Sequence, residues 1–63
     1  ERFVFTLRSS ESFEGLLIEA DEKTVRIADA YALQDSSSRV AVDGELYLPR
    51  AEIAYMQKPE GRS

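Results

Sequence analysis

Few side chains in this sequence can support catalysis or hold a metal ion. The 63 residues contain no histidine and no cysteine, and no serine lies in a nucleophile-elbow context. Carboxylates are the only metal ligands left, and the spacing of Asp35 and Asp43 matches no calcium-loop motif. Glu19 and Asp21 form a carboxylate pair, but two acids alone are weak evidence for acid–base catalysis. We expect no enzymatic activity, no small-molecule substrate, no metal site and no cofactor.

Two other polar residues, Asp21 and Arg50, each suit a structural role as well as a role in binding a ligand. Asp21 opens an Asp-Glu-Lys turn, where its carboxylate can accept hydrogen bonds from the amides that follow it. Arg50 is the best single candidate for binding a ligand. An exposed arginine beside a proline also suits a salt bridge across a subunit interface, with Glu45 or Glu52 as its partner.

The overall charge excludes some classes of function. The net charge of −4 argues against a general nucleic-acid coat and against polybasic attraction to a membrane, although a local basic site is compatible with it. No apolar run approaches the roughly 18 residues that span a bilayer. The absence of cysteine and of a signal-peptide pattern favours a cytoplasmic location.

The length permits one small domain. A chain of about 60 residues buries only about 60% of its surface on folding and usually needs further support. Without cysteine or histidine, this chain has neither a disulfide nor a thiolate metal site. We therefore expect the chain to gain the missing stability by forming an oligomer. We place the domain at residues 2–57 and a flexible tail at residues 58–63.

Alternating hydrophobic residues predict strands. A first strand is expected over residues 2–8, with Phe3, Phe5 and Leu7 facing the core. A second covers residues 12–20 and is interrupted by Gly15, which indicates a bulge, a bend or a close backbone approach. A third begins at Thr24 and ends at Ala28 or as late as Leu33, with the side chains of residues 25 and 27 on one face.

The second half predicts two further strands. Residues 34–38 read as a polar loop, and a fourth strand over residues 39–48 is broken near Asp43-Gly44, a strong turn signal. A short final strand is expected over residues 52–57, although the same segment contains good helix formers. Five strands with short turns suggest a small barrel or a strongly bent sheet.

Two motifs within this series of predicted strands resemble the Sm-like (LSm) family. Residues 13–21 have the spacing F-x-G-x-L-x-x-x-D, and residues 44–48 read Gly-Glu-Leu-Tyr-Leu before a corner at Pro49-Arg50. The resemblance covers roughly residues 3–56. It implies an all-β fold, namely a small, five-stranded, strongly bent Sm-like (SH3-like) barrel. The N-terminal helix of the family is missing from this sequence.

The resemblance also implies a site. In Sm-like proteins a base binds near the pore of a ring, stacked between a residue of the turn and a basic residue at the corner, while an asparagine reads its edge. These roles fall to Lys23, Thr24 and Arg50, with Asp21 orienting the turn. Thr24 replaces the usual asparagine, and none of the three is aromatic. The guanidinium plane of Arg50 can still stack on a base.

The family forms rings by pairing strand four of one subunit with strand five of the next. The resemblance therefore implies a homo-oligomeric ring, which would cover the exposed sheet edges. Its expected interface contains Leu46, Tyr47, Leu48, Ile53 and Tyr55. The leading expectation is a ring-forming module that binds single-stranded RNA at the pore face. A ring with no nucleic-acid role and a monomeric SH3-like barrel that binds a protein remain open alternatives.

Overall fold

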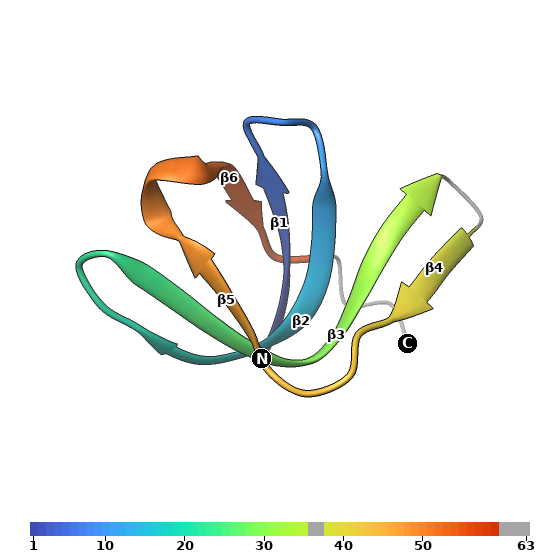
Figure 1. Ribbon diagram of the computed structural model, residues 1–63, viewed down its shortest axis with the longest axis horizontal. Coiled ribbons are helices and arrows are strands. Elements are labelled where there is room, and N and C mark those ends of the chain that lie inside the picture. The colour runs from blue at the N-terminus through green and yellow to red at the C-terminus, as the bar shows by residue number, and fades with distance from the viewer. Residues whose placement is uncertain (36–37, 60–63) are drawn as a thin grey trace.

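The computed structural model of the protein describes residues 1–35 and 38–59. The regular structure in this part is antiparallel β-strand apart from one 3-10 turn (Figure 1), so the all-β class is confirmed. The elements in chain order are β1 (Arg2–Leu7), β2 (Ser12–Ala20), β3 (Thr24–Asp35), β4 (Ser38–Ala41), β5 (Leu46–Pro49), the 3-10 turn η1 (Arg50–Glu52) and β6 (Ile53–Gln57). Within the described residues, no helix is long and apolar enough to cross a membrane.

The strands form one sheet in the order β4-β3-β2-β1-β6, with β5 also paired to β3. Strand β4 lies along residues 31–35 of β3, and β5 lies along residues 24–27. The predicted count of five is wrong, because the expected fourth strand is divided at Asp43-Gly44 into two strands. Gly44 has a φ of +78°, which glycine adopts without steric cost.

The sheet is not closed into a barrel. Across the described residues, β5 pairs only with β3 and β6 pairs only with β1. A closed barrel would need a ladder between β5 and β6, and the connection through η1 leaves these strands unpaired with each other. The structure is therefore a curved, open sheet with a free edge at each end.

Strands β2 and β3 curve together (Figure 1), and Gly15 lies between Glu14 and Leu16, where their register shifts. A Cβ atom at Gly15 would lie 3.0 Å from Cδ1 of Ile27 and 3.2 Å from the carbonyl oxygen of Ala28. The β2–β3 register shifts at this point, and Asp29 of β3 has a φ of 52°. A register shift of this kind bends a strand. The predicted close backbone approach at Gly15 is confirmed.

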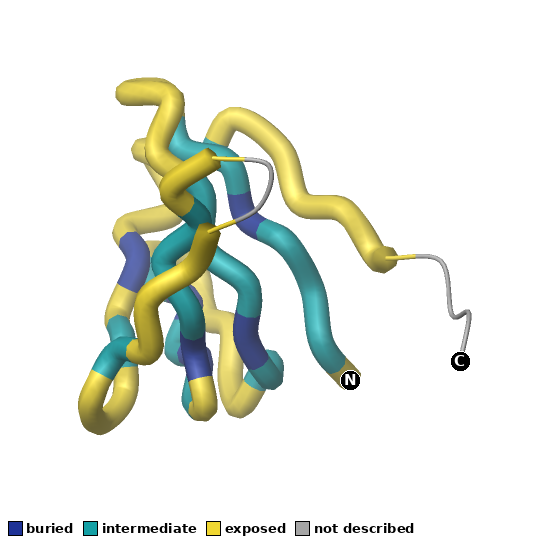
Figure 2. Tube along the Cα trace, turned by 90° about the vertical axis from the view of Figure 1, so that its right-hand side faces the viewer, coloured by how far each residue is buried: buried dark blue, intermediate teal, exposed yellow. Residues whose placement is uncertain are grey.

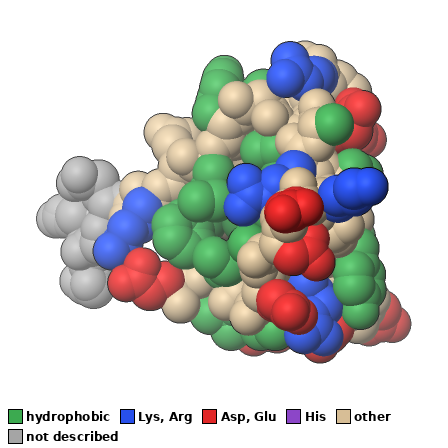
Figure 3. Space-filling model, turned by 90° about the vertical axis from the view of Figure 1, so that its left-hand side faces the viewer, with side chains coloured by type: hydrophobic (Ala, Val, Ile, Leu, Met, Phe, Trp, Pro, Cys, Tyr) green, Lys and Arg blue, Asp and Glu red, His purple; other side chains and the backbone are tan. Residues whose placement is uncertain are grey.

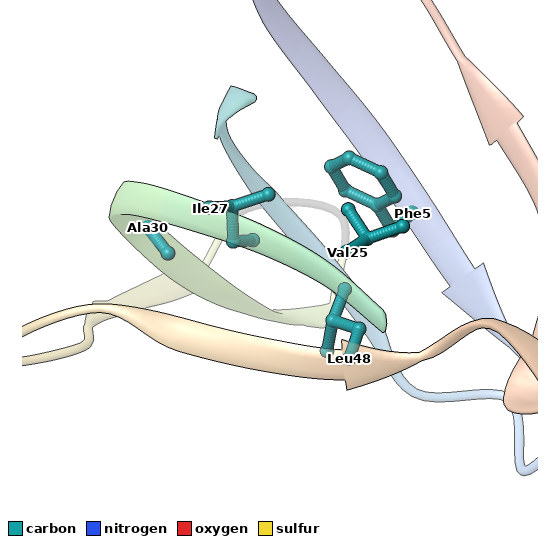
Figure 4. Close-up of a cluster of buried hydrophobic side chains, with 5 residues drawn as sticks. All are labelled: Phe5, Val25, Ile27, Ala30 and Leu48. Carbon is teal, nitrogen blue, oxygen red and sulfur yellow. The ribbon is translucent and has the colours of Figure 1, made fainter. Parts of the chain in front are cut away.

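The core is a small cluster in the hollow of the sheet (Figure 4), made of Phe5, Val25, Ile27, Ala30 and Leu48. The side chains come from β1, β3 and β5, and Phe5 and Ile27 are fully buried. The inward orientation predicted for Phe5 is confirmed, and residues 25 and 27 share one face as predicted, whereas Leu7 is neither in this cluster nor packed against it. Phe3 packs against the cluster from the side, with its ring 6.2 Å from that of Phe5.

Several predicted boundaries differ from the structure. The expected loop at residues 34–38 is partly strand, because β3 continues to Asp35 and β4 begins at Ser38; residues 36–37 lie outside the described part. The final segment is strand from Ile53 onward, and only η1 before it is helical. Of the predicted tail, Lys58 forms an ion pair of 3.2 Å with Glu1, and residues 60–63 are outside the described part.

Candidate functional site

The turn between β2 and β3 is closed by Asp21. Its Oδ1 accepts hydrogen bonds from the backbone amides of Lys23, at 3.0 Å, and Thr24, at 2.9 Å. The amide of Asp21 in turn donates to the carbonyl of Thr24 at 2.9 Å. Asp21 therefore bonds the amides ahead of it, as the sequence predicts.

These bonds also change the acidity of Asp21. Hydrogen bonds from the amides of Thr24 and then Lys23 lower the pKa of the carboxyl below its usual value of 3.8, and the positive charge of Arg50 acts in the same direction. An amide that points at a carboxylate stabilises the charged form. The turn is consequently most stable when Asp21 is ionised.

Arg50 lies beside this turn although it is far away in the sequence. Pro49 pairs with Thr24 across the β3–β5 ladder, and this register brings the first residue of η1 to the turn. The amide of Arg50 donates to the carbonyl of Lys23 at 2.8 Å, and its Nε donates to the carbonyl of Asp21 at 2.6 Å. All four residues predicted for the RNA site therefore lie together.

The face of the molecule that carries the β2–β3 turn and η1 has both charged and hydrophobic side chains (Figure 3). Residues 21–24 line an open depression. Next to it is a pocket of about 240 Å³, lined by Leu17, Ala20, Val25, Arg50, Ile53 and Met56. Arg50 thus borders an apolar pocket on one side and the polar turn on the other. This pocket was not predictable from local sequence, because its residues come from four separate elements.

The side chains at this site can bind a ligand through charge, stacking and hydrogen bonds. Arg50 uses Nε to hold the turn, and among the described residues neither Arg50 nor Lys23 forms an ion pair with a carboxylate. A guanidinium with free terminal nitrogens can donate to phosphate or stack on a base. The hydroxyl of Thr24, which is half-buried, can donate or accept a hydrogen bond. Within the described part, no three acidic residues gather as metal ligands.

The five residues predicted for a subunit interface divide into two groups. Leu48 is buried in the core, and Leu46 and Ile53 pack against it. Tyr47 on β5 and Tyr55 on β6 are instead 61% and 62% exposed. Their strands form the two ends of the open sheet, and β6 is exposed beyond its first residue (Figure 2). Of the five, the tyrosines are the most exposed to a neighbour, and Leu46 and Ile53 are only partly exposed. The interface remains a prediction.

Arg8 is a residue of this region that sequence reasoning missed. Its amide donates to the carbonyl of Glu52 and its Nε donates to the carbonyl of Ala51, both at 2.8 Å. Arg8 therefore holds the last two residues of η1, while Arg50, its first residue, joins η1 to the β2–β3 turn. In the local sequence Arg8 is a lone arginine at the end of a predicted strand. Such arginines are common on protein surfaces, so nothing there pointed to its contact with η1.

Comparisons of this chain with protein-family models, with curated proteins and with solved structures give no match.

Proposed function

We propose that this protein is an Sm-like, ring-forming module that binds single-stranded RNA on the face formed by the β2–β3 turn and η1. One observation carries the proposal. The register of β3 with β5 places Arg50 on the turn that holds Asp21, Lys23 and Thr24, and these are the positions at which the resemblance implies base binding. The contact was not visible in the local sequence, so it is support independent of the motif.

Each residue has a distinct part in this proposal. The guanidinium of Arg50 stacks on a base or donates to a phosphate, and its Nε bond to Asp21 fixes its orientation. Lys23 contributes positive charge, and Thr24 offers a hydroxyl to the edge of the base. Asp21 touches no RNA and orients the turn through its two amide bonds. Base stacking on a protein side chain contributes about 1–3 kcal/mol per base.

Assembly into a ring follows from the edges of the sheet. Strands β4 and β5 lie at one end and β6 at the other, each with unpaired backbone groups. Exposed edges of this kind pair readily with another chain. Joining β6 of one copy to β5 of the next is a head-to-tail contact, which closes into a ring when the rotation allows it. The ring would repeat the RNA site once per subunit.

The test is binding of a fluorescent U-rich oligonucleotide at low salt. We expect Arg50→Ala to weaken binding by about tenfold or more, the loss of roughly one stacked base, while the mass of the assembly stays unchanged. Arg39→Ala is the matched control, because Arg39 is an exposed arginine already paired with Glu14 at 3.2 Å. Unchanged RNA binding by Arg50→Ala would remove Arg50 from the site. Dissociation of the assembly would make Arg50 an interface residue.

A second candidate is a ring that binds protein and not RNA. The net charge of −4 and the exposed tyrosines on both edge strands favour it. The same titration separates the two candidates. Assembly without binding to any oligonucleotide would favour the protein-binding ring.

A further inference from the structure

The basic side chains of this protein fall into two groups. Four of them in the described part form ion pairs with glutamates: Arg2 and Arg39 with Glu14, Arg26 with Glu19 and Glu45, and Lys58 with Glu1. Within the same part, Arg8, Lys23 and Arg50 form none. The unpaired cations are not scattered, because all three contact η1 or the turn that η1 touches.

Arg8 and Arg50 are held in the same way. Each donates through its backbone amide and through Nε to carbonyl oxygens: Arg8 to residues 52 and 51, and Arg50 to residues 23 and 21. A guanidinium fixed through Nε keeps its terminal nitrogens free in a planar fork, the geometry that suits phosphate oxygens. Each arginine is therefore oriented before any ligand arrives.

Among the described residues, the acidic side chains near Arg8 form no ion pair with it. Glu52 offers its backbone carbonyl to the amide of Arg8, and the carboxylate of Glu11 accepts from the hydroxyl of Ser9 at 3.2 Å. Glutamates pair with four other described cations, whereas the guanidinium of Arg8 has no carboxylate partner within the described residues. It gives an anion a defined place to bind.

We propose that Arg8 is a further RNA-binding residue, which contacts a backbone phosphate. Arg8 is bonded to the last two residues of η1 and Arg50 is its first residue. The two arginines take phosphates at different positions of one strand, and Lys23 adds charge on the side of the turn. This inference rests on the proposed RNA-binding function and adds the phosphodiester backbone as the group recognised. Phosphate carries no sequence information, so Arg8 adds affinity for every sequence alike.

The test measures oligonucleotide affinity against salt concentration for U-rich and A-rich 15-mers. We expect Arg8→Gln to reduce the slope of log affinity against log salt by about one, as loss of one phosphate contact should. Affinity should fall by the same factor, roughly tenfold at 0.1 M salt, for both sequences. Arg39→Gln is the control. It removes the same charge from an exposed, ion-paired arginine and should match the wild type.

Arg8→Lys separates charge from positioning. A phosphate-binding role predicts that lysine restores the salt slope, whereas a role limited to holding Ala51 predicts that lysine binds as weakly as glutamine. In unmodified protein, the Nε–H resonance of Arg8 should shift when RNA is added. This measurement applies even if the variants fold poorly.

Three results would overturn the inference: an unchanged salt slope in Arg8→Gln, no rescue by Arg8→Lys, or an unmoved resonance. If the wild type binds and Arg50→Ala weakens it while Arg8→Gln does not, this inference alone fails. If the wild type binds neither oligonucleotide, the proposed function fails as well.

Discussion

At the scale of single residues, Asp21 connects the stability of the turn to the position of Arg50. Its carboxylate holds the amides of Lys23 and Thr24, and its carbonyl accepts from Nε of Arg50. The first role was predictable because it joins residues two and three positions apart. The contact with Arg50 was not predictable from local pattern, because it depends on the register of two strands far apart in the sequence.

The lowered pKa of Asp21 predicts a pH-dependent stability. Because the folded-state pKa lies below that of the unfolded chain, ionised Asp21 stabilises the fold above about pH 4, and this contribution is lost as the pH falls through the folded-state pKa. We expect Asp21→Asn to be less stable than the wild type at pH 7, with the difference shrinking as the pH falls toward 2. Urea denaturation across this range measures it.

Glu22→Gln is the control for that experiment, since it removes a neighbouring carboxylate that makes no hydrogen bond to the turn amides. Its stability curve should run parallel to that of the wild type. A gap between Asp21→Asn and the wild type that stays constant down to pH 2 would show that the charge of Asp21 does not stabilise the turn.

At the scale of elements, the curve of β2 and β3 depends on two residues, Gly15 and Asp29, that lie where the register of the two strands shifts. Gly15 leaves room for Ile27 and Ala28, and Asp29 adopts a positive φ where the register shifts. The sequence indicated the role of Gly15, because a glycine that interrupts a strand is a recognised sign of a bulge, a bend or a close backbone approach. It did not indicate that of Asp29. Aspartate is uncommon inside strands, so its type gives no sign that β3 continues through this position.

Gly15→Val should destabilise the fold. The new side chain would meet Ile27 and the carbonyl of Ala28, and backbone cannot move aside as a flexible side chain can. Overpacking of this kind costs about 1–3 kcal/mol, which is large for a chain with so small a core. Thermal unfolding followed by circular dichroism measures the loss. A variant that melts with the wild type would contradict the close approach at Gly15.

Asp29 gives a second test of the same curve. Its φ of 52° lies in the left-handed region, which asparagine and aspartate tolerate and β-branched residues do not. We expect Asp29→Asn to unfold with the wild type and Asp29→Val to lose about 1–2 kcal/mol. Chemical denaturation compares the two variants. Equal stability would mean that β3 does not need this conformation.

At the scale of the whole molecule, the open sheet explains why assembly is expected. Only five hydrophobic residues in the described part are buried, while Tyr47, Tyr55 and Met56 stay exposed on the edge strands. The sequence predicted the shortage of core from length alone. It left both a small barrel and a strongly bent sheet with exposed edges as possibilities, because closure depends on how η1 connects β5 to β6.

The edge tyrosines predict where assembly can be broken. Tyr47→Lys or Tyr55→Lys should place a charge in the contact between β5 and β6 of neighbouring copies and lower the mass in solution. Ile18→Lys is the control, because Ile18 is 46% exposed but lies on β2 and not on either of the strands β5 and β6. Sedimentation velocity measures the three variants. Equal masses for all of them and the wild type would place the contact away from these edges.

The most direct test of the account is the mass of the unmodified protein in solution, measured by light scattering over a range of concentrations with and without a U-rich oligonucleotide at low salt. We predict a mass several times the 7.1 kDa of one chain, a fold whose stability rises with protein concentration, and a further gain in mass when RNA is added. A mass of 7.1 kDa at every concentration, unchanged by RNA, would contradict both the ring and its binding site.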